Sequence, residues 1–201
     1  SGGSLDFSGG TFKLGDDFTK TAGTLTTTEV GTILELMDNL TKSLSLTSNT
    51  SLAVKTLTLN DKSLTLGSET TALTVSDPIT LDGADEQINT QSADLTLQGG
   101  FILDNGTLSS TGGKVSFEKG AGQSGGSLDV SDSTLKLGDN YIKTAGILTA
   151  TDDGTILELT ESLSLTSNTP VSVKTLNLND KTITLGSETT DLTVSDGMTL
   201  N

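Results

Sequence analysis

The 201-residue chain lacks histidine, cysteine and tryptophan, and it has only two prolines, five phenylalanines and one tyrosine. Without histidine, the side chain most often used for general acid–base catalysis is missing. Without cysteine, thiol nucleophiles, zinc–thiolate sites and disulfides are excluded, and the redox compartment stays open. No segment approaches the ~20 apolar residues of a membrane-spanning helix, so we expect no membrane insertion.

Positive charge is also scarce. The chain has 26 acidic against 11 basic residues, a formal net charge of −15. Nucleic acid and anionic membrane surfaces would repel such a chain, so neither is an expected partner. Acidic surfaces rich in Thr and Ser are typical of secreted proteins, which predicts an extracellular or cell-surface location. No signal peptide is visible at Ser1, so we expect any targeting signal to lie outside this chain.

The most prominent feature of the sequence is a long internal repeat. Residues 1–82 recur as residues 124–201, with 56 of 78 aligned positions identical. Residues 37–40 have no counterpart in the second copy, as expected for a corner loop. The intervening residues 83–123 are not repeated. Because the second copy stops at Asn201, we expect the chain to come from a longer array with a period of about 120 residues.

A shorter period lies inside each repeat. Apolar–polar–apolar triplets such as Leu44-Ser45-Leu46, Leu64-Thr65-Leu66 and Leu95-Thr96-Leu97 predict short strands with one buried face. Turn-forming clusters such as Asn60-Asp61-Lys62 separate them. Three consecutive strands span roughly 20–22 residues. We therefore predict an all-β fold: a single continuous right-handed parallel β-helix, or β-solenoid, over residues 1–201, with about 20–22 residues per coil.

Two other all-β architectures stay open at this stage. A sandwich of two duplicated domains, or a barrel, would also alternate apolar and polar residues. A sandwich, however, usually has strands of about five residues or more around an aromatic core. The scarcity of aromatic residues favours the solenoid, with stacked Leu, Ile and Val inside and Thr, Ser, Lys and Asn outside.

The Leu-x-Leu strands, the Gly, Asn and Asp corners and the near-identical long repeats carry a family resemblance over the whole chain. They resemble the β-solenoid repeat regions of large bacterial surface proteins, namely filamentous haemagglutinin-like and autotransporter-like adhesins. The resemblance implies an extracellular rod that holds a binding region away from the cell or that itself assembles into fibres.

Three acidic pairs, Asp16-Asp17, Asp85-Glu86 and Asp152-Asp153, are the candidates for a catalytic site. All three lie near turn signals, so we interpret them as solvated corner carboxylates and predict that the chain is not an enzyme. Calcium would require oxygen ligands, and the fragments Gly9-Gly10-Thr11 and Gly112-Gly113-Lys114 lack most of the β-roll calcium motif. We therefore predict no catalytic, cofactor-binding or metal-ligating residues, with calcium the one cofactor left open.

Ice binding would require Thr-x-Thr pairs on the same wall of every coil. The candidates are Thr26-Thr27-Thr28, Thr56-Leu57-Thr58 and Thr149-Ala150-Thr151, but the position of Thr58 is Asn177 in the second copy. The irregular array favours ordinary outer-wall threonines.

Two further motifs are treated as structural or accidental. Glycosylation sequons at Asn39, Asn49 and Asn105 are expected by chance in a chain so rich in Thr and Ser. The glycines that the repeat preserves are expected to occupy corners with positive φ: Gly31, Gly67, Gly154 and Gly186.

A structural fibre or adhesin stalk is the predicted function. Each coil of a solenoid contacts only its neighbours, so uncapped ends favour either continuation of a longer chain or end-to-end self-association into a filament. The alternative is a binding module that uses a Thr/Ser/Asn-rich wall to recognise ice, glycan or protein. An enzyme is the third hypothesis.

Overall fold

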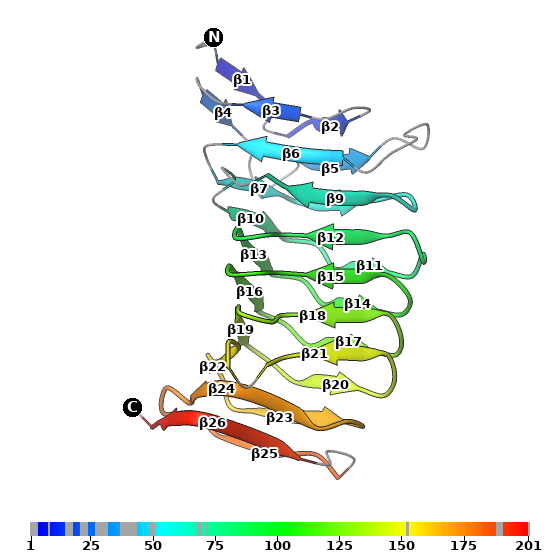
Figure 1. Ribbon diagram of the computed structural model, residues 1–201. Helices are drawn as coiled ribbons and strands as arrows, with labels where there is room; N and C mark the ends of the chain where they lie inside the picture. Colours follow the sequence, from blue (N-terminus) through cyan, green and yellow to red (C-terminus); the bar gives the residue numbers. More distant parts are fainter. Residues whose placement is uncertain are drawn as a thin grey trace.

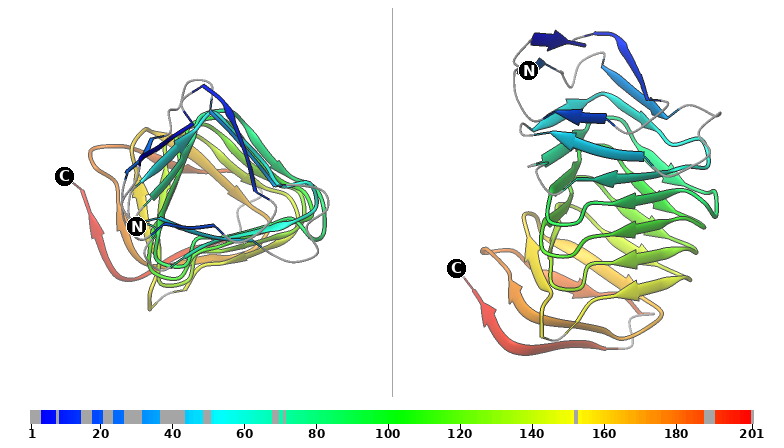
Figure 2. Two further views of the ribbon diagram at one scale, coloured as in Figure 1. Left: turned by 90° about the horizontal axis from the view of Figure 1, so that it is seen from above. Right: turned by 45° about the horizontal axis from the view of Figure 1, so that its top comes forward.

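A computed structural model of the chain is a right-handed β-solenoid of about seven turns (Figure 1). It describes residues 4–7, 9–14, 18–20, 24–26, 32–36, 44–48, 51–67, 70, 72–151, 153–187 and 191–200. These residues form strands and turns but no helix, and hence none that could cross a membrane. Seen along its axis, the coil is triangular (Figure 2).

The handedness follows from the direction of the strands. In Figure 1, the strands β12, β15 and β18 (Gln87–Asn89, Thr107–Ser109 and Ser127–Asp129) run from right to left across the front while the chain descends from N to C. All the strand pairings are parallel, as in β10 with β13 (Ala72–Val75 and Asp94–Leu97). Parallel stacking confirms the predicted solenoid and rules out the sandwich and barrel alternatives.

Three walls account for most of the strands. Wall 1 is the eight-stranded sheet, wall 2 the six-stranded sheet and wall 3 the seven-stranded sheet. Wall 1 contains β7 (Leu52–Val54), β10, β13, β16 (Lys114–Phe117), β19 (Thr134–Leu137), β22 (Ile156–Leu159), β24 (Val171–Asn177) and β26 (Leu192–Thr199). Wall 2 contains β11 (Ile79–Leu81), β14 (Phe101–Leu103), β17 (Ala121–Gln123), β20 (Tyr141–Lys143), β23 (Leu163–Ser167) and β25 (Ile183–Leu185). Wall 3 contains β3 (Phe18–Lys20), β6 (Leu44–Ser48), β9 (Ser63–Leu66), β12, β15, β18 and β21 (Ile147–Thr149).

Two smaller sheets lie at the N-terminal end of the solenoid (Figure 1). One pairs β1 (Ser4–Asp6) with β4 (Thr24–Thr26), and the other pairs β2 (Thr11–Leu14), β5 (Ile33–Leu36) and β8 (Thr56–Thr58).

The strand register sets the length of each coil. On wall 1, Leu73 pairs with Leu95, and Leu95 in turn pairs with Val115 one coil later. Further along the same wall, Leu157 pairs with Leu176, which makes that coil slightly shorter. The first two steps each pass through one strand of walls 2 and 3, whereas the step from Leu157 to Leu176 passes through β23 of wall 2 only. The predicted coil length is therefore confirmed.

Left-handed backbone conformations close several corners. Asn60 and Asp61 have φ of 53° and 57°, and their counterparts in the second copy, Asn179 and Asp180, have 50° and 58°. Asn and Asp tolerate this conformation better than other non-glycine residues. At another corner, the N–H of Gln91 (φ 49°) donates to Asn89 Oδ1 over 3.0 Å. The predicted turn cluster Asn60-Asp61-Lys62 thus forms a tight corner.

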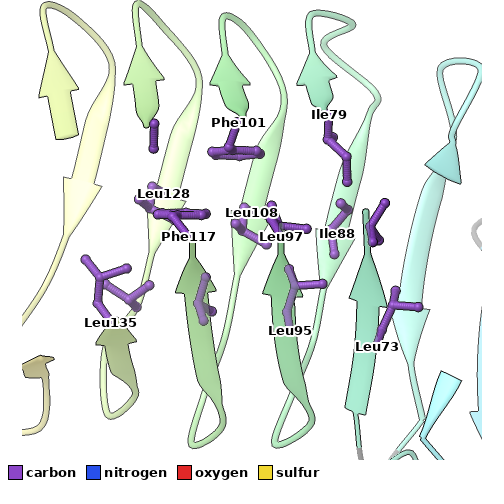
Figure 3. Close-up of a cluster of buried hydrophobic side chains, with 14 of the residues drawn as sticks. Leu73, Ile79, Ile88, Leu95, Leu97, Phe101, Leu108, Phe117, Leu128 and Leu135 are labelled. Atoms are coloured by element: carbon purple, nitrogen blue, oxygen red, sulfur yellow. The ribbon is translucent and has the colours of Figure 1, made fainter. Parts of the chain in front are cut away.

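The inward-facing residues form one continuous core. Buried leucine, isoleucine and valine side chains stack from coil to coil inside the triangle (Figure 3). The rings of Phe101 and Phe117 stack with their centroids 4.9 Å apart. Few aromatic residues are needed because each coil encloses a narrow space that a ring of aliphatic side chains fills.

The two copies of the long repeat use the same pairings but lie on different walls. Phe18 pairs with Leu46 on wall 3, and their counterparts Tyr141 and Leu165 pair on wall 2. The strands β3 and β20 are 17 strands apart in chain order. From β3 to β20 each coil takes three strands, so a shift of 17 strands is five whole coils and two further strands. The repeat therefore returns rotated around the rod.

Candidate functional surfaces

Stacking arranges the outward side chains in columns along the rod. One column of wall 1 reads Thr74, Thr96, Ser116, Lys136, Glu158 and Asn177. Lys136 Nζ lies 3.5 Å from Glu158 Oε1, and the same pair in the first copy, Lys13 and Glu35, is separated by 3.0 Å. Both pairs are partly exposed, so each contributes little to stability.

The structure places Thr56-Leu57-Thr58 beside these charged residues. Thr58 continues the column of Lys13 and Glu35, while Leu57 is buried. Thr56 Oγ1 donates to Asp77 Oδ2 over 2.6 Å, and Lys55 Nζ donates to the same oxygen over 2.8 Å. The hydrogen bonds from Lys55 and Thr56 lower the pKa of Asp77. This triplet therefore serves a corner rather than a regular threonine face.

Wall 3 has the most uniformly polar outer face. Its two columns read Ser63, Gln87, Thr107, Ser127 and Ile147, and Thr65, Asn89, Ser109, Asp129 and Thr149. Thr149 of the candidate Thr149-Ala150-Thr151 lies here, beside Asp129, and Ala150 packs against the core. Of the candidate Thr26-Thr27-Thr28, only Thr26 lies within the described residues.

The described acidic candidates do not form a catalytic pair. Asp85 is exposed, whereas Glu86 is buried and its Oε2 accepts hydrogen bonds from the N–H groups of Asp82 (3.0 Å) and Gly83 (3.2 Å). Glu86 thus holds a corner together. Asp153 is exposed, while Asp16-Asp17 and Asp152 lie outside the described residues. Within the part of the chain that the structure describes, no three acidic residues gather as a metal site would require.

A buried polar cluster was missed from the sequence. Tyr141 Oη donates to Gln123 Oε1 over 2.6 Å, and Gln123 Nε2 donates to the carbonyl of Ile147 over 2.8 Å. Lys143, 1% exposed, donates from Nζ to Asn168 Oδ1 over 2.7 Å. Burial raises the pKa of Tyr141 and lowers that of Lys143. One feature of β20 could have pointed to this cluster. Its apolar Ile142 occupies the outward position and Lys143 the inward position, which is the inverse of the usual alternation.

The glycine prediction is wrong for the described positions. Gly67, Gly154 and Gly186 do not have positive φ, whereas Gly9, Gly112, Gly126 and Gly146 do. Gly154 and Gly186 are glycines because neighbouring side chains, Asp132 and Thr166, occupy the space a Cβ would need. Glycine is needed at these two positions because neighbouring coils approach closely, and not because the backbone has a positive φ. Gly31 lies outside the described residues.

One sequon lies in a described corner. Asn105 is exposed between β14 and β15, and Thr107 begins β15. The sequon asparagines Asn39 and Asn49 are outside the described residues.

Comparison with known proteins identifies no family to which the chain could be assigned. No protein-family model, no curated protein and no solved structure matches the chain. The function is therefore argued from the geometry of the solenoid itself.

Proposed function

We propose that the chain is a structural segment of an extracellular or cell-surface fibre or adhesin stalk. The observation that carries the proposal is the parallel ladder of wall 1, which stacks eight strands from β7 to β26 over a filled apolar core. In such a stack, hydrogen bonds run along the rod axis and every coil supports the next. Length and stiffness are the properties this arrangement supplies.

The proposal assigns no catalysis and no cofactor to the chain. It is supported by the roles of the described carboxylates, which lie exposed, as Asp85 and Asp153 do, or hold a corner, as Glu86 does. The absence of histidine and cysteine from the sequence points the same way.

The proposed assembly grows along the axis. Each parallel coil carries hydrogen-bonding groups on both edges and so presents a template for another coil. Further coils would come from the same polypeptide or from separate chains stacked end to end, and head-to-tail stacking of this kind gives an open filament.

Immuno-electron microscopy of intact source cells tests the location and shape together. Antibodies against the purified chain are expected to label thin projections on unpermeabilised cells. Antibodies against a cytoplasmic protein serve as the control and should label only permeabilised cells. Labelling by the test antibody that also requires permeabilisation would overturn the surface-fibre proposal.

Wall 3 supports a second candidate, a binding module for glycans. Nine of the ten residues in its two outer columns are polar, and most carry a hydroxyl or an amide. Such groups match the donors and acceptors of sugars. A glycan array probed with the purified chain is expected to give specific signals that fall when Asn89 and Ser109 are replaced by Ala, and an array without signal would remove this candidate.

A further inference from the structure

The outer face of wall 2 carries an apolar slot. Its central column reads Thr80, Ile102, Gly122, Ile142 and Thr166. Ile102 and Ile142 are 47% and 48% exposed, and Gly122 lies between them. The hollow has a volume of about 310 Å³ and is also lined by Gln123, Ser124 and Thr144.

The fold does not explain why residue 122 is glycine. Glycine weakens the interior of a strand and usually marks a bulge or the close approach of another group. Gly122 has no positive φ, and a Cβ there would meet nothing within 4 Å. By contrast, a Cβ on Gly125 or Gly126 would collide with the backbone of the preceding coil. What glycine does at position 122 is keep the slot open.

The slot is wide enough to admit an aliphatic side chain between the two isoleucines. Neighbouring strands lie ~4.8 Å apart, so Ile102 and Ile142, two strands apart, are separated by ~9.6 Å between backbones. The flanking isoleucines form two apolar sides, and the backbone of β17 forms the floor. A branched aliphatic side chain inserted there would contact apolar groups on both sides.

Area and charge argue against a second copy of this chain as the occupant. The exposed strip is three residues wide and five strands tall, ~10 Å by ~24 Å or ~240 Å², against ~800 Å² per partner in a stable interface. Two copies, each with a net charge of −15, would also repel each other.

The rims of the slot favour a basic partner. Asp104 is exposed at one edge of wall 2, and Glu118 and Asp139 are exposed at the other, where Lys119 adds one positive charge. A segment carrying lysine or arginine would be attracted to both rims and to the chain as a whole.

We propose that the slot binds an aliphatic side chain presented by an extended, positively charged segment of another protein. This goes beyond the structural role proposed above, because it gives the rod a lateral docking point. The two proposals are tested independently. If no surface fibres are found, the proposal that the slot binds a partner still stands. If the slot binds no peptide, the proposal of a structural fibre still stands.

A peptide titration of the full 201-residue chain tests the proposal. The probe is a fluorescent synthetic heptapeptide with a central isoleucine between lysines, and the control peptide has glycine at the centre. We expect saturable binding to the first, weakened at least 10-fold in the second, with methyl NMR shifts confined to Ile102 and Ile142. Equal binding of the two peptides would overturn the proposal, because charge alone would then explain it.

Three variants locate the binding. Gly122→Val places a side chain in the slot, starting from a Cβ that meets nothing within 4 Å, and is expected to weaken binding of the isoleucine peptide at least 10-fold. Ile142→Thr removes one side of the slot and introduces the residue that the first repeat copy has, Thr19. Gly197→Val is the matched control, since a Cβ there also meets nothing within 4 Å and the site lies on β26.

Each remaining outcome also decides the question. Unchanged binding by Gly122→Val, with circular dichroism showing a folded chain, would overturn the proposal. So would the absence of any binding at millimolar peptide. Concentration-dependent dimerisation in sedimentation that Gly122→Val abolishes would identify a second copy as the occupant and overturn the assignment to a basic partner.

Discussion

At the scale of single residues, glycines that look alike in the sequence have different roles. Gly126 and Gly122 lie on the same short stretch of chain. Gly126 has φ of 57° and faces the carbonyl of Gly106 at close approach, whereas Gly122 has an open strand position. The sequence contains no sign of this difference, because it depends on what the previous coil places opposite each residue.

Alanine at these two positions is expected to give opposite results. Gly126→Ala should lower the free energy of unfolding by about 1–3 kcal/mol, since it adds both backbone strain and a steric clash. Gly122→Ala should be neutral or stabilising by up to about 1 kcal/mol. Urea denaturation of both variants measures the difference, and equal losses would contradict the open position of Gly122.

Lys143 is the residue at which stability should respond to pH. Burial lowers the pKa of Lys143 in the folded chain, so the unfolded chain binds the proton more tightly. Between the lowered pKa and the ordinary lysine value of about 10.4, stability therefore rises with pH. The raised pKa of Tyr141 acts oppositely, but only above pH ~10, where the unfolded tyrosine ionises.

Lys143→Met is expected to remove this pH response. The substitution should raise the free energy of unfolding at pH 7 by on the order of 1 kcal/mol, because it replaces a buried charge with an apolar chain. Denaturation over a series of pH values from 7 up to about 10 should show stability rising as the pH approaches the ordinary lysine value in the original chain but not in the variant. Lys119→Met, at an exposed residue, is the control and should keep the rise; a rise that survives in Lys143→Met would contradict the assignment.

At the scale of single strands, a regular alternation of apolar and polar residues was sufficient to predict a strand and its buried face. The triplets Leu64-Thr65-Leu66 and Leu95-Thr96-Leu97 were predicted as strands and form β9 and β13, with the leucines buried. β17, with the sequence Ala121-Gly122-Gln123, has no such signal. It is a strand because β14 and β20 pair with it on both sides.

The two faces of a strand should differ sharply in their tolerance of substitution. In β15, Leu108 is fully buried and Thr107 points outward. Leu108→Ala should cost about 2–5 kcal/mol, through lost burial and a cavity. Thr107→Ala should cost less than about 1 kcal/mol. Thermal or urea unfolding measures both, and similar losses would contradict the assignment of the faces.

At the scale of the whole molecule, the rod should tolerate removal of a coil but not of a single strand. Leu95 pairs with Val115 one coil later, so deleting residues 94–113 removes β13, β14 and β15 and keeps every later strand on its wall. Deleting residues 104–113 removes only β15 and shifts all later strands to the wrong wall. In a solenoid each coil depends on its neighbours alone, which permits the first deletion.

Circular dichroism and denaturation of the two deletions check this expectation. The whole-coil deletion should keep the β signal per residue and cooperative unfolding, with some loss of stability. The single-strand deletion should lose both, because the apolar faces of the later strands no longer line one interior. A folded single-strand deletion would contradict three strands per coil as the unit of the rod.

The sequence by itself determined the solenoid, the coil length and the Asn and Asp corners, because period-2 alternation and Asn and Asp turns are local properties that can be predicted from residue order. The tertiary structure alone decided which residues meet across coils. It turned Lys143 inward onto Asn168, made β17 a strand, placed the two repeat copies on different walls and set Gly122 between two exposed isoleucines. These outcomes depend on contacts between residues a full coil apart in the chain, and their register is fixed only when the coils stack.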